Sequence, residues 1–207
     1  MLASRHKNPR LNVLSAPDRL VQTSICDLVV VGGSAGGIPA LISLLKALPT
    51  DFPLPILVVQ HLSRKVPSRL PEVLQWHTRW AVKWAEDGEP IRPGMVYVGP
   101  ADRHLLVEPD QRLVLSSAPP VGWWRPAVDA LFQSAAEVYG ERVAAVVLSG
   151  AMWDGAKGMA AVASQGGITI VQDEATCGHF DMPACALDLG RADLIMSPGK
   201  IAEVLQA

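Results

Sequence analysis

Three side chains in this sequence, a serine, a histidine and an aspartate, have the chemistry of a hydrolytic active site. Ser34, His61 and Asp154 each follow an apolar run of strand length, so each is expected beyond the end of a different strand. A serine hydroxyl attacks an acyl carbon when an imidazole takes its proton, and a carboxylate orients that imidazole and stabilises its cation. The three residues therefore predict a nucleophile, a base and an orienting carboxylate.

The serine lies in a glycine-rich segment, Gly32-Gly33-Ser34-Ala35-Gly36-Gly37. Its Gly-x-Ser-x-Gly pattern fits a nucleophile elbow, in which small residues on both sides of the serine allow a sharp turn. A glycine-rich turn between a strand and a helix can also bind phosphate on its backbone N–H groups, and many such turns carry no chemistry. The motif alone leaves these three interpretations open. The run lacks the GxGxxG order and the Walker lysine, which ranks a nucleotide site below the others.

Attack on an acyl carbon creates an oxyanion, which needs hydrogen-bond donors that are already in place. The Ala35 N–H, at the start of the helix that follows Ser34, is the expected first donor. The chain order serine, histidine, aspartate differs from the serine, aspartate, histidine order of the common α/β-hydrolases. Because triads are recognised by geometry, this order argues only against that superfamily.

Short apolar runs alternate along the chain with segments of helical periodicity. The predicted strands cover residues 27–31, 55–60, 80–84, 95–98, 142–148, 168–171 and 193–196. The predicted helices cover residues 38–48, 67–76, 126–139, 155–165, 183–189 and 198–205. Continuous apolar strands are typical of parallel sheets that are covered on both faces. The pattern predicts an α/β fold with a doubly wound, mostly parallel sheet and helices on both faces, whose ligands bind beyond the carboxyl ends of the strands.

Two segments depart from this alternation. Residues 104–108 and 112–115 flank a Pro-Asp-Gln turn and predict a hairpin, which would add an antiparallel edge to the sheet. Trp76, Trp80 and Trp84 form an aromatic stripe that we interpret as packing in the core or on a sheet face.

Composition limits the function classes. The 207 residues are 49% apolar and 18% charged with a formal charge of −2, which predicts one globular domain and excludes a nucleic-acid-binding surface. Cys26, Cys177 and Cys185 lack CxxC spacing, so we expect neither a disulfide framework nor a metal site. No apolar run reaches the roughly 20 residues of a membrane span, and no signal peptide is recognised. We therefore expect a cytoplasmic protein without membrane insertion.

Several motifs occur together and in order along the chain, and together they resemble the catalytic domain of CheB-type protein-glutamate methylesterases. The resemblance runs from about Leu28 to the carboxyl terminus, and it divides the chain into a tail or linker, 1–24, and a catalytic domain, 25–207. Its motifs are the glycine-rich serine segment, Gln60-His61-Leu62, Ala85-Glu86-Asp87-Gly88-Glu89, Pro93-Gly94-Met95-Val96-Tyr97-Val98, Pro119-Pro120-Val121, Arg125-Pro126-x-Val128-Asp129, Asp154-Gly155-Ala156-Lys157-Gly158-Met159 and Met182-Pro183.

The resemblance implies that Ser34, His61 and Asp154 correspond to the catalytic serine, histidine and aspartate of the family. It implies hydrolysis of glutamyl γ-methyl esters on a methylated chemoreceptor or receptor-like signalling protein, with release of methanol. Some members of the family also deamidate receptor glutamines. The family's reaction uses no metal and no organic cofactor, so none is expected here.

The chain departs from the family pattern in three places. Regulated members carry an amino-terminal receiver domain, and the residues before the first predicted strand are too few for one, so we expect another form of control or none. Gly122-Trp123-Trp124 replaces a polar segment and predicts a more apolar site. Ala151 stands where the chemotaxis enzymes have a methionine whose backbone helps to form the oxyanion hole, and a backbone donor survives that replacement.

The remaining polar residues have structural alternatives. Arg125, next to Pro126, is a candidate substrate-facing cation, and its alternative is a surface salt bridge. Asp154 could also cap the helix that Gly155 opens. His104 and His179 receive no role. The alternative for the whole protein is a catalytically silent interaction module on the same scaffold.

Overall fold

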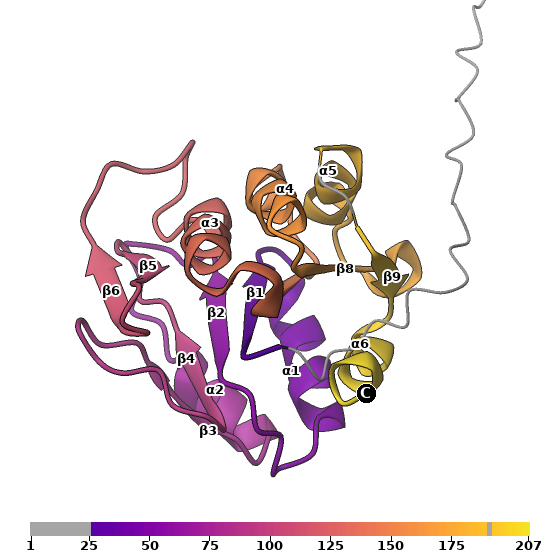
Figure 1. The fold of residues 1–207 in the computed structure, drawn as a ribbon, viewed down its shortest axis with the longest axis horizontal. Coiled ribbons are helices and arrows are strands. Elements are labelled where there is room, and N and C mark those ends of the chain that lie inside the picture. The colour runs from indigo at the N-terminus through magenta and orange to yellow at the C-terminus, as the bar shows by residue number, and fades with distance from the viewer. Residues whose placement is uncertain (1–25, 190–191) are drawn as a thin grey trace, which may run out of the picture.

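A computed structural model describes residues 26–189 and 192–207. Its centre is a seven-stranded sheet in which every neighbouring pair of strands is parallel, in the order β3-β4-β2-β1-β7-β8-β9 (Figure 1). The strands are β1 (Leu28–Gly33), β2 (Ile56–Gln60), β3 (Ala81–Trp84), β4 (Met95–Val98), β7 (Val143–Val147), β8 (Ile168–Gln172) and β9 (Leu194–Met196). The predicted tail, 1–24, lies outside the described residues.

Helices cover both faces of the sheet, as Figure 1 shows. They are α1 (Gly37–Ala47), α2 (Leu70–His77), α3 (Val128–Tyr139), α4 (Ala156–Ser164), α5 (Asp181–Leu189) and α6 (Pro198–Leu205). Successive side chains of a strand point to opposite faces. Val29 and Val31 of β1 accordingly belong to a core with α1, α2 and α6, whereas Leu28 and Val30 belong to a core with α3, α4 and α5. This two-sided burial explains the continuous apolar runs and confirms the predicted α/β fold.

The predicted hairpin is present as β5 (His104–Val107) and β6 (Leu113–Ser116), paired antiparallel. It forms a separate two-stranded sheet instead of extending the edge of the main sheet. Its apolar residues are buried in the core that α3 covers, so burial holds the hairpin against that helix. The Val107 N–H donates to Ser134 Oγ of α3 at 3.1 Å. A helix side chain thereby satisfies a strand donor that sheet pairing would otherwise have used.

The tryptophans of the predicted stripe have different environments in the structure. Trp80 is buried, and its indole N–H donates to the Leu45 carbonyl of α1 at 3.0 Å. Trp76 is 87% exposed and stacks on His77, so its assignment to packing in the core was wrong. The strand that ends at Trp84 is confirmed as β3.

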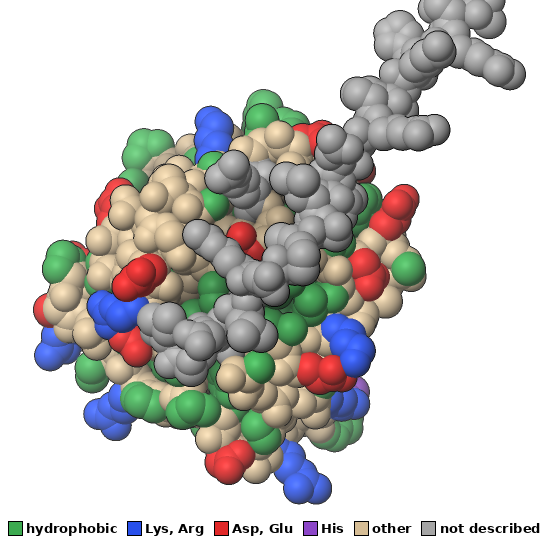
Figure 2. All heavy atoms as spheres, turned by 45° about the vertical axis from the view of Figure 1, so that its right-hand side comes forward, with side chains coloured by type: hydrophobic (Ala, Val, Ile, Leu, Met, Phe, Trp, Pro, Cys, Tyr) green, Lys and Arg blue, Asp and Glu red, His purple; other side chains and the backbone are tan. Residues whose placement is uncertain are grey.

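The described surface carries charges of both signs. On the face drawn in Figure 2, acidic and basic side chains lie interspersed among apolar and uncharged ones. Cys26, Cys177 and Cys185 are free thiols. Within residues 26–189 and 192–207, no helix is both long enough and apolar enough to cross a bilayer.

Candidate active site

The parallel register brings the candidate serine and histidine to neighbouring strand ends. Gly33 of β1 pairs with Gln60 of β2, so Ser34 and His61 are the next residues on the two adjacent strands. The His61 N–H donates to the Gly33 carbonyl at 3.0 Å, which continues the ladder beyond the strand ends. On its other side, the Ser34 N–H donates to the Ser149 carbonyl, beyond the end of β7, at 3.0 Å. Ser34 is therefore held between the ends of β2 and β7.

The sharp turn after the serine is made by Gly36. This residue is left-handed, with φ 74°, and is the N-cap of α1. A Cβ built on Gly36 would lie 2.5 Å from Ser149 Oγ, so both the conformation and the space require glycine. Ser34 itself is not among the residues with positive φ in the described chain. Its carbonyl accepts a hydrogen bond from Gln60 Nε2 at 2.7 Å, which fixes the turn.

His61 and Asp154 form a buried pair. His61 Nε2 lies 2.7 Å from Asp154 Oδ2, and the two side chains are 3% and 2% exposed. The Asp154 side chain also accepts the N–H groups of Val128, at 2.7 Å on Oδ2, and Asp129, at 2.9 Å on Oδ1. Because an ionised carboxylate only accepts hydrogen bonds, we assign a proton to His61 Nε2, which leaves the lone pair of a neutral ring on Nδ1. Nδ1 is buried and has no hydrogen-bond partner within the described residues, as a base awaiting a proton requires.

Asp154 does not cap the helix that follows it. Its hydrogen bonds to Val128 and Asp129 satisfy the first turn of α3, whereas the N-cap of α4 is Gly155, with no side-chain cap. In turn, Asp129 of α3 accepts hydrogen bonds from the start of α4. Its Oδ1 accepts the N–H groups of Gly155, at 3.0 Å, and Gly158, at 2.8 Å. Two aspartates thus exchange caps between α3 and α4, which fixes Asp154 opposite His61.

Asp129 is a site-supporting residue that sequence reasoning missed. It is buried, and burial raises the pKa of its carboxyl. The N–H groups of Gly158 and Gly155 lower that pKa, and the charge of Asp154 raises it. The signal in the sequence was an aspartate in the first turn of a predicted helix, which commonly satisfies its own helix. Here it satisfies the neighbouring helix.

The two predicted oxyanion donors, Ala35 and Ala151, follow Ser34 and Gly150 in the chain. A Cβ on Gly150 would lie 3.0 Å from Ser34 Cβ, so the segment that leads to Ala151 runs against the serine. The backbone N–H groups of Ala35 and Ala151 donate to no acceptor within the part of the chain that the structure describes. The same part of the chain contains no hydrogen bond between Ser34 Oγ and His61. The structure therefore joins His61 to Asp154 and places Ser34 beside them without that last contact.

Arg125, the predicted substrate-facing cation, is held by Asp102 and by two backbone carbonyls. Its Nε and Nη2 donate to Asp102 Oδ1 at 3.0 and 2.6 Å, and its Nη1 donates to the Ser117 and Ala118 carbonyls at 2.9 and 3.0 Å. The hydrogen bond from Arg125 holds the pKa of the Asp102 carboxyl below its usual value. Helix α3 begins at Val128, so Pro126 is not at the helix start. The salt bridge with Asp102 is therefore present, and a role of Arg125 toward substrate stays a prediction.

The tryptophan and histidine rings near the site differ in their exposure and in their contacts. The Trp124 ring stacks on the His61 ring, with 3.8 Å between centroids and 7° between planes. Trp123 is 72% exposed, so only one of the two tryptophans reaches the histidine. His104 is buried, and its ring nitrogens contact the Pro119 carbonyl at 3.1 Å and the Ala127 N–H at 3.3 Å. His179 is exposed.

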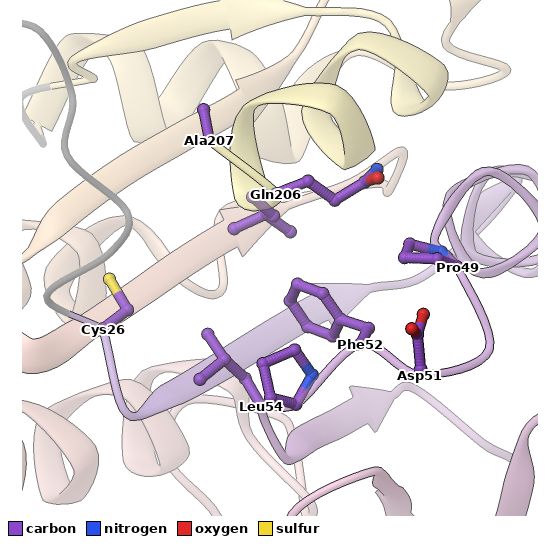
Figure 3. Close-up of a pocket in the computed structure, with 9 residues that line it drawn as sticks. Cys26, Pro49, Asp51, Phe52, Leu54, Gln206 and Ala207 are labelled. Carbon is purple, nitrogen blue, oxygen red and sulfur yellow. The ribbon is translucent and has the colours of Figure 1, made fainter.

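A pocket of about 420 Å³ lies at the opposite end of the sheet (Figure 3). Its lining includes Cys26, which precedes β1, and Leu54, which precedes β2, so it opens at the amino ends of these strands. Burial, and then the charge of Asp27, raises the pKa of the Cys26 thiol to about 11, which keeps it protonated near neutral pH. This pocket contains none of the candidate catalytic side chains.

Comparisons with known proteins identify one family. A family model described as CheB methylesterase matches residues 29–205. A putative protein-glutamate methylesterase/protein-glutamine glutaminase of Leptospira interrogans is 39% identical over 178 residues, which cover 86% of this chain and 92% of the relative. A protein-glutamate methylesterase/protein-glutamine glutaminase of Anaeromyxobacter dehalogenans is 41% identical over 192 residues, which cover 93% of this chain and 55% of the relative.

A solved structure supports the same assignment. The crystal structure of the Thermotoga maritima CheB methylesterase catalytic domain matches with a TM-score of 0.83 and 37% identity, over 87% of this chain and 98% of that one. Sequence, family model and fold agree over nearly all of the described residues. The chain therefore belongs to the CheB methylesterase family.

Proposed function

We propose that this protein is a serine hydrolase that releases methanol from glutamyl γ-methyl esters of a chemoreceptor or receptor-like signalling protein. The observation that carries the proposal is the buried His61–Asp154 pair, whose free Nδ1 lies beside the strand end that presents Ser34. Membership of the CheB methylesterase family and relatives named protein-glutamate methylesterase support the substrate class. The proposed setting of this reaction is the cytoplasm.

In the proposed acylation step, Ser34 Oγ bonds to the ester carbonyl carbon while its proton moves to His61 Nδ1. The step requires the serine hydroxyl to reach Nδ1, and the paired residues that precede Ser34 and His61, Gly33 and Gln60, support this contact. The carbonyl oxygen becomes an oxyanion that accepts the N–H groups of Ala35 and Ala151. Collapse breaks the bond to the methoxy oxygen, which takes the proton from His61 and leaves as methanol.

In the proposed deacylation step, water replaces methanol. His61 Nδ1 takes a proton from a water molecule, whose oxygen bonds to the acyl carbon of the Ser34 ester. Collapse of this second intermediate returns the proton to Ser34 Oγ and releases the glutamyl carboxylic acid, which gives its remaining proton to water and becomes a carboxylate. Asp154 keeps the same imidazole nitrogen available in both steps, because three donors hold its carboxylate in place.

The same residues can act on a glutamine side chain, with ammonia in place of methanol as the leaving group. The names of the relatives, which include protein-glutamine glutaminase, favour this second activity. It requires protonation of the leaving amide nitrogen by His61, which the proposed geometry supplies. Glutamine deamidation is therefore the second candidate reaction of this site.

The test compares wild-type protein with Ser34→Ala in a methanol-release assay on a methylated chemoreceptor. Loss of the nucleophile should reduce turnover by at least about 10³-fold. Glu203→Gln, in the exposed part of α6, is the matched control, and its turnover should equal that of the wild type. Methanol release by Ser34→Ala at the wild-type rate would overturn the proposal.

A fluorophosphonate probe separates this proposal from a catalytically silent module. Ser34 Oγ would bond to phosphorus and expel fluoride while His61 takes the hydroxyl proton. Wild-type protein should label at Ser34, and Ser34→Ala should not label. An unreactive serine in folded wild-type protein would favour the silent module.

A further inference from the structure

We propose that Trp124 is a positioning residue for the base: its indole face stabilises the His61 imidazolium that forms when Ser34 gives up its proton. The inference rests on the proposed function, because it concerns the proton-transfer step of that reaction. It assigns a role to a tryptophan in a segment where the sequence departs from the family pattern.

The geometry of the two rings allows the indole face to attract a positive charge on the imidazole. The Trp124 and His61 centroids are 3.8 Å apart and their planes differ by 7°, so the imidazole lies over the indole face. A cation within about 6 Å of an aromatic centroid is attracted by the negative face of the ring, and tryptophan is the strongest such partner. The His61 side chain is 3% exposed, so little water competes for its charge. Water therefore screens the attraction between the indole face and the imidazolium only weakly.

The other polar and charged groups around His61 that the structure describes do not stack on the face of its ring as the indole does. Asp154 contacts the imidazole at Nε2, on the edge of the ring, and its carboxylate is shared with the first turn of α3. From the end of β1, the neighbouring side chain is the uncharged Ser34. Arg125, which follows Trp124 in the chain, pairs with Asp102, and Arg64 contacts the same carboxylate. Asp154 thus stabilises the imidazolium along its edge, and Trp124 stabilises it across its face.

Backbone contacts hold the tryptophan in place. The Val121 N–H donates to the Trp124 carbonyl, and the Trp124 N–H donates to the Val121 carbonyl, each at 3.1 Å. The next residue, Arg125, is fixed through Asp102 and through two backbone carbonyls. Trp124 Nε1 is buried and has no acceptor within the described residues, so the ring position depends on stacking and on the backbone. Phenylalanine at this position would keep an aromatic face and remove the unpaired donor.

The inferred role predicts a specific kinetic signature. The positive charge on His61 is present in the transition state and absent in the resting enzyme, so the indole face contributes mainly to kcat. Loss of the face in Trp124→Leu should lower kcat for methanol release about tenfold, with KM within about twofold of wild type. Trp124→Phe should stay within about threefold of wild type. A purely structural role would give both variants the same defect.

The experiment measures the rate at which a fluorophosphonate labels Ser34, which needs proton transfer to His61 and no receptor substrate. We expect Trp124→Leu to label about tenfold more slowly than wild type and Trp124→Phe to label within about threefold of it. Trp123→Leu, in the same turn and 72% exposed in the parent, is the matched control and should label at the wild-type rate. Equal labelling of Trp124→Leu and wild type, or equal defects in Trp124→Leu and Trp124→Phe, would overturn the inference.

A second series covers the case in which Trp124→Leu does not fold. Fluorinated tryptophans, placed at position 124 alone by nonsense suppression, keep the shape of the indole and weaken the negative charge of its face. The labelling rate should fall progressively as fluorines are added, and a rate independent of fluorination would contradict the inference. Absence of Ser34 labelling in the wild type would instead refute the proposed function, so the two failures are distinguishable.

Discussion

Replacing Asp154 with asparagine tests how the carboxylate holds the base. In the wild type, Oδ2 accepts from His61 Nε2 and from the Val128 N–H, whereas Oδ1 accepts only from the Asp129 N–H. An asparagine has one acceptor oxygen and one donor nitrogen. Placing its oxygen at the Oδ2 position satisfies two donors instead of one. We therefore expect this orientation, which leaves the proton on His61 Nε2 and the lone pair on Nδ1.

The magnitude of the activity loss follows from that orientation. The tautomer survives, so the cost is the lost attraction between a carboxylate and the imidazolium, roughly 2–3 kcal/mol for a buried pair. Such a difference in the transition state corresponds to a fall in kcat of about 30- to 150-fold. A change of tautomer would cost about 10⁴-fold, as in serine proteases with this substitution.

Stability should also decrease. The asparagine amino group faces the Asp129 N–H, a buried donor that loses its acceptor. One buried unsatisfied N–H costs about 1–3 kcal/mol of unfolding free energy. Urea denaturation measures this change, and activity is compared under conditions in which both proteins are folded.

Asp129→Asn is the matched control for Asp154→Asn. Both hydrogen bonds of the Asp129 side chain go to one oxygen, Oδ1, which an asparagine can reproduce. Burial already raises the pKa of this carboxyl, so a neutral amide replaces it at little cost. The control should stay within about 1 kcal/mol of wild-type stability. A 10⁴-fold loss of kcat in Asp154→Asn, or a loss under threefold, would refute the orientation argument.

Two further predictions concern the turn and the thiols. Gly36→Ala should lower the unfolding free energy by about 1–3 kcal/mol, since φ is 74° and the new Cβ would meet Ser149 Oγ; unchanged urea denaturation would contradict the steric argument. Cys26 and Cys177 should react slowly with iodoacetamide near pH 7, because burial and then nearby acidic charges raise both thiol pKa values to about 11. Reactivity measured by mass spectrometry should rise with pH toward that value, and a plateau near pH 8 would show the assigned burial to be wrong.

Local patterns in the sequence determined the elements and the order of the strand ends. Continuous apolar runs predicted β1, β2 and β7 as two-sided strands because a strand buried on both faces has no polar positions. Glycines and prolines marked the turns, since their backbone preferences are local. Helix ends were less well predicted: α2 begins at Leu70, three residues after the expected start at residue 67. Parallel strand ends meet at one edge, which is why Ser34 and His61 could be placed together.

Tertiary structure alone decided how the side chains at that edge are connected. The His61–Asp154 contact spans 93 residues, and the hydrogen bond from Val128 to Asp154 spans 26. Asp154 and Asp129 exchange caps, and Trp124 stacks on His61. Neither contact produces a repeating pattern of residue types in the sequence. Hydrogen bonds and ring contacts depend on direction and on distances of a few ångströms, which packing sets. Sequence patterns report which face of an element is apolar, where the chain turns and which reactive residue types follow the strands, but not the contacts between their side chains.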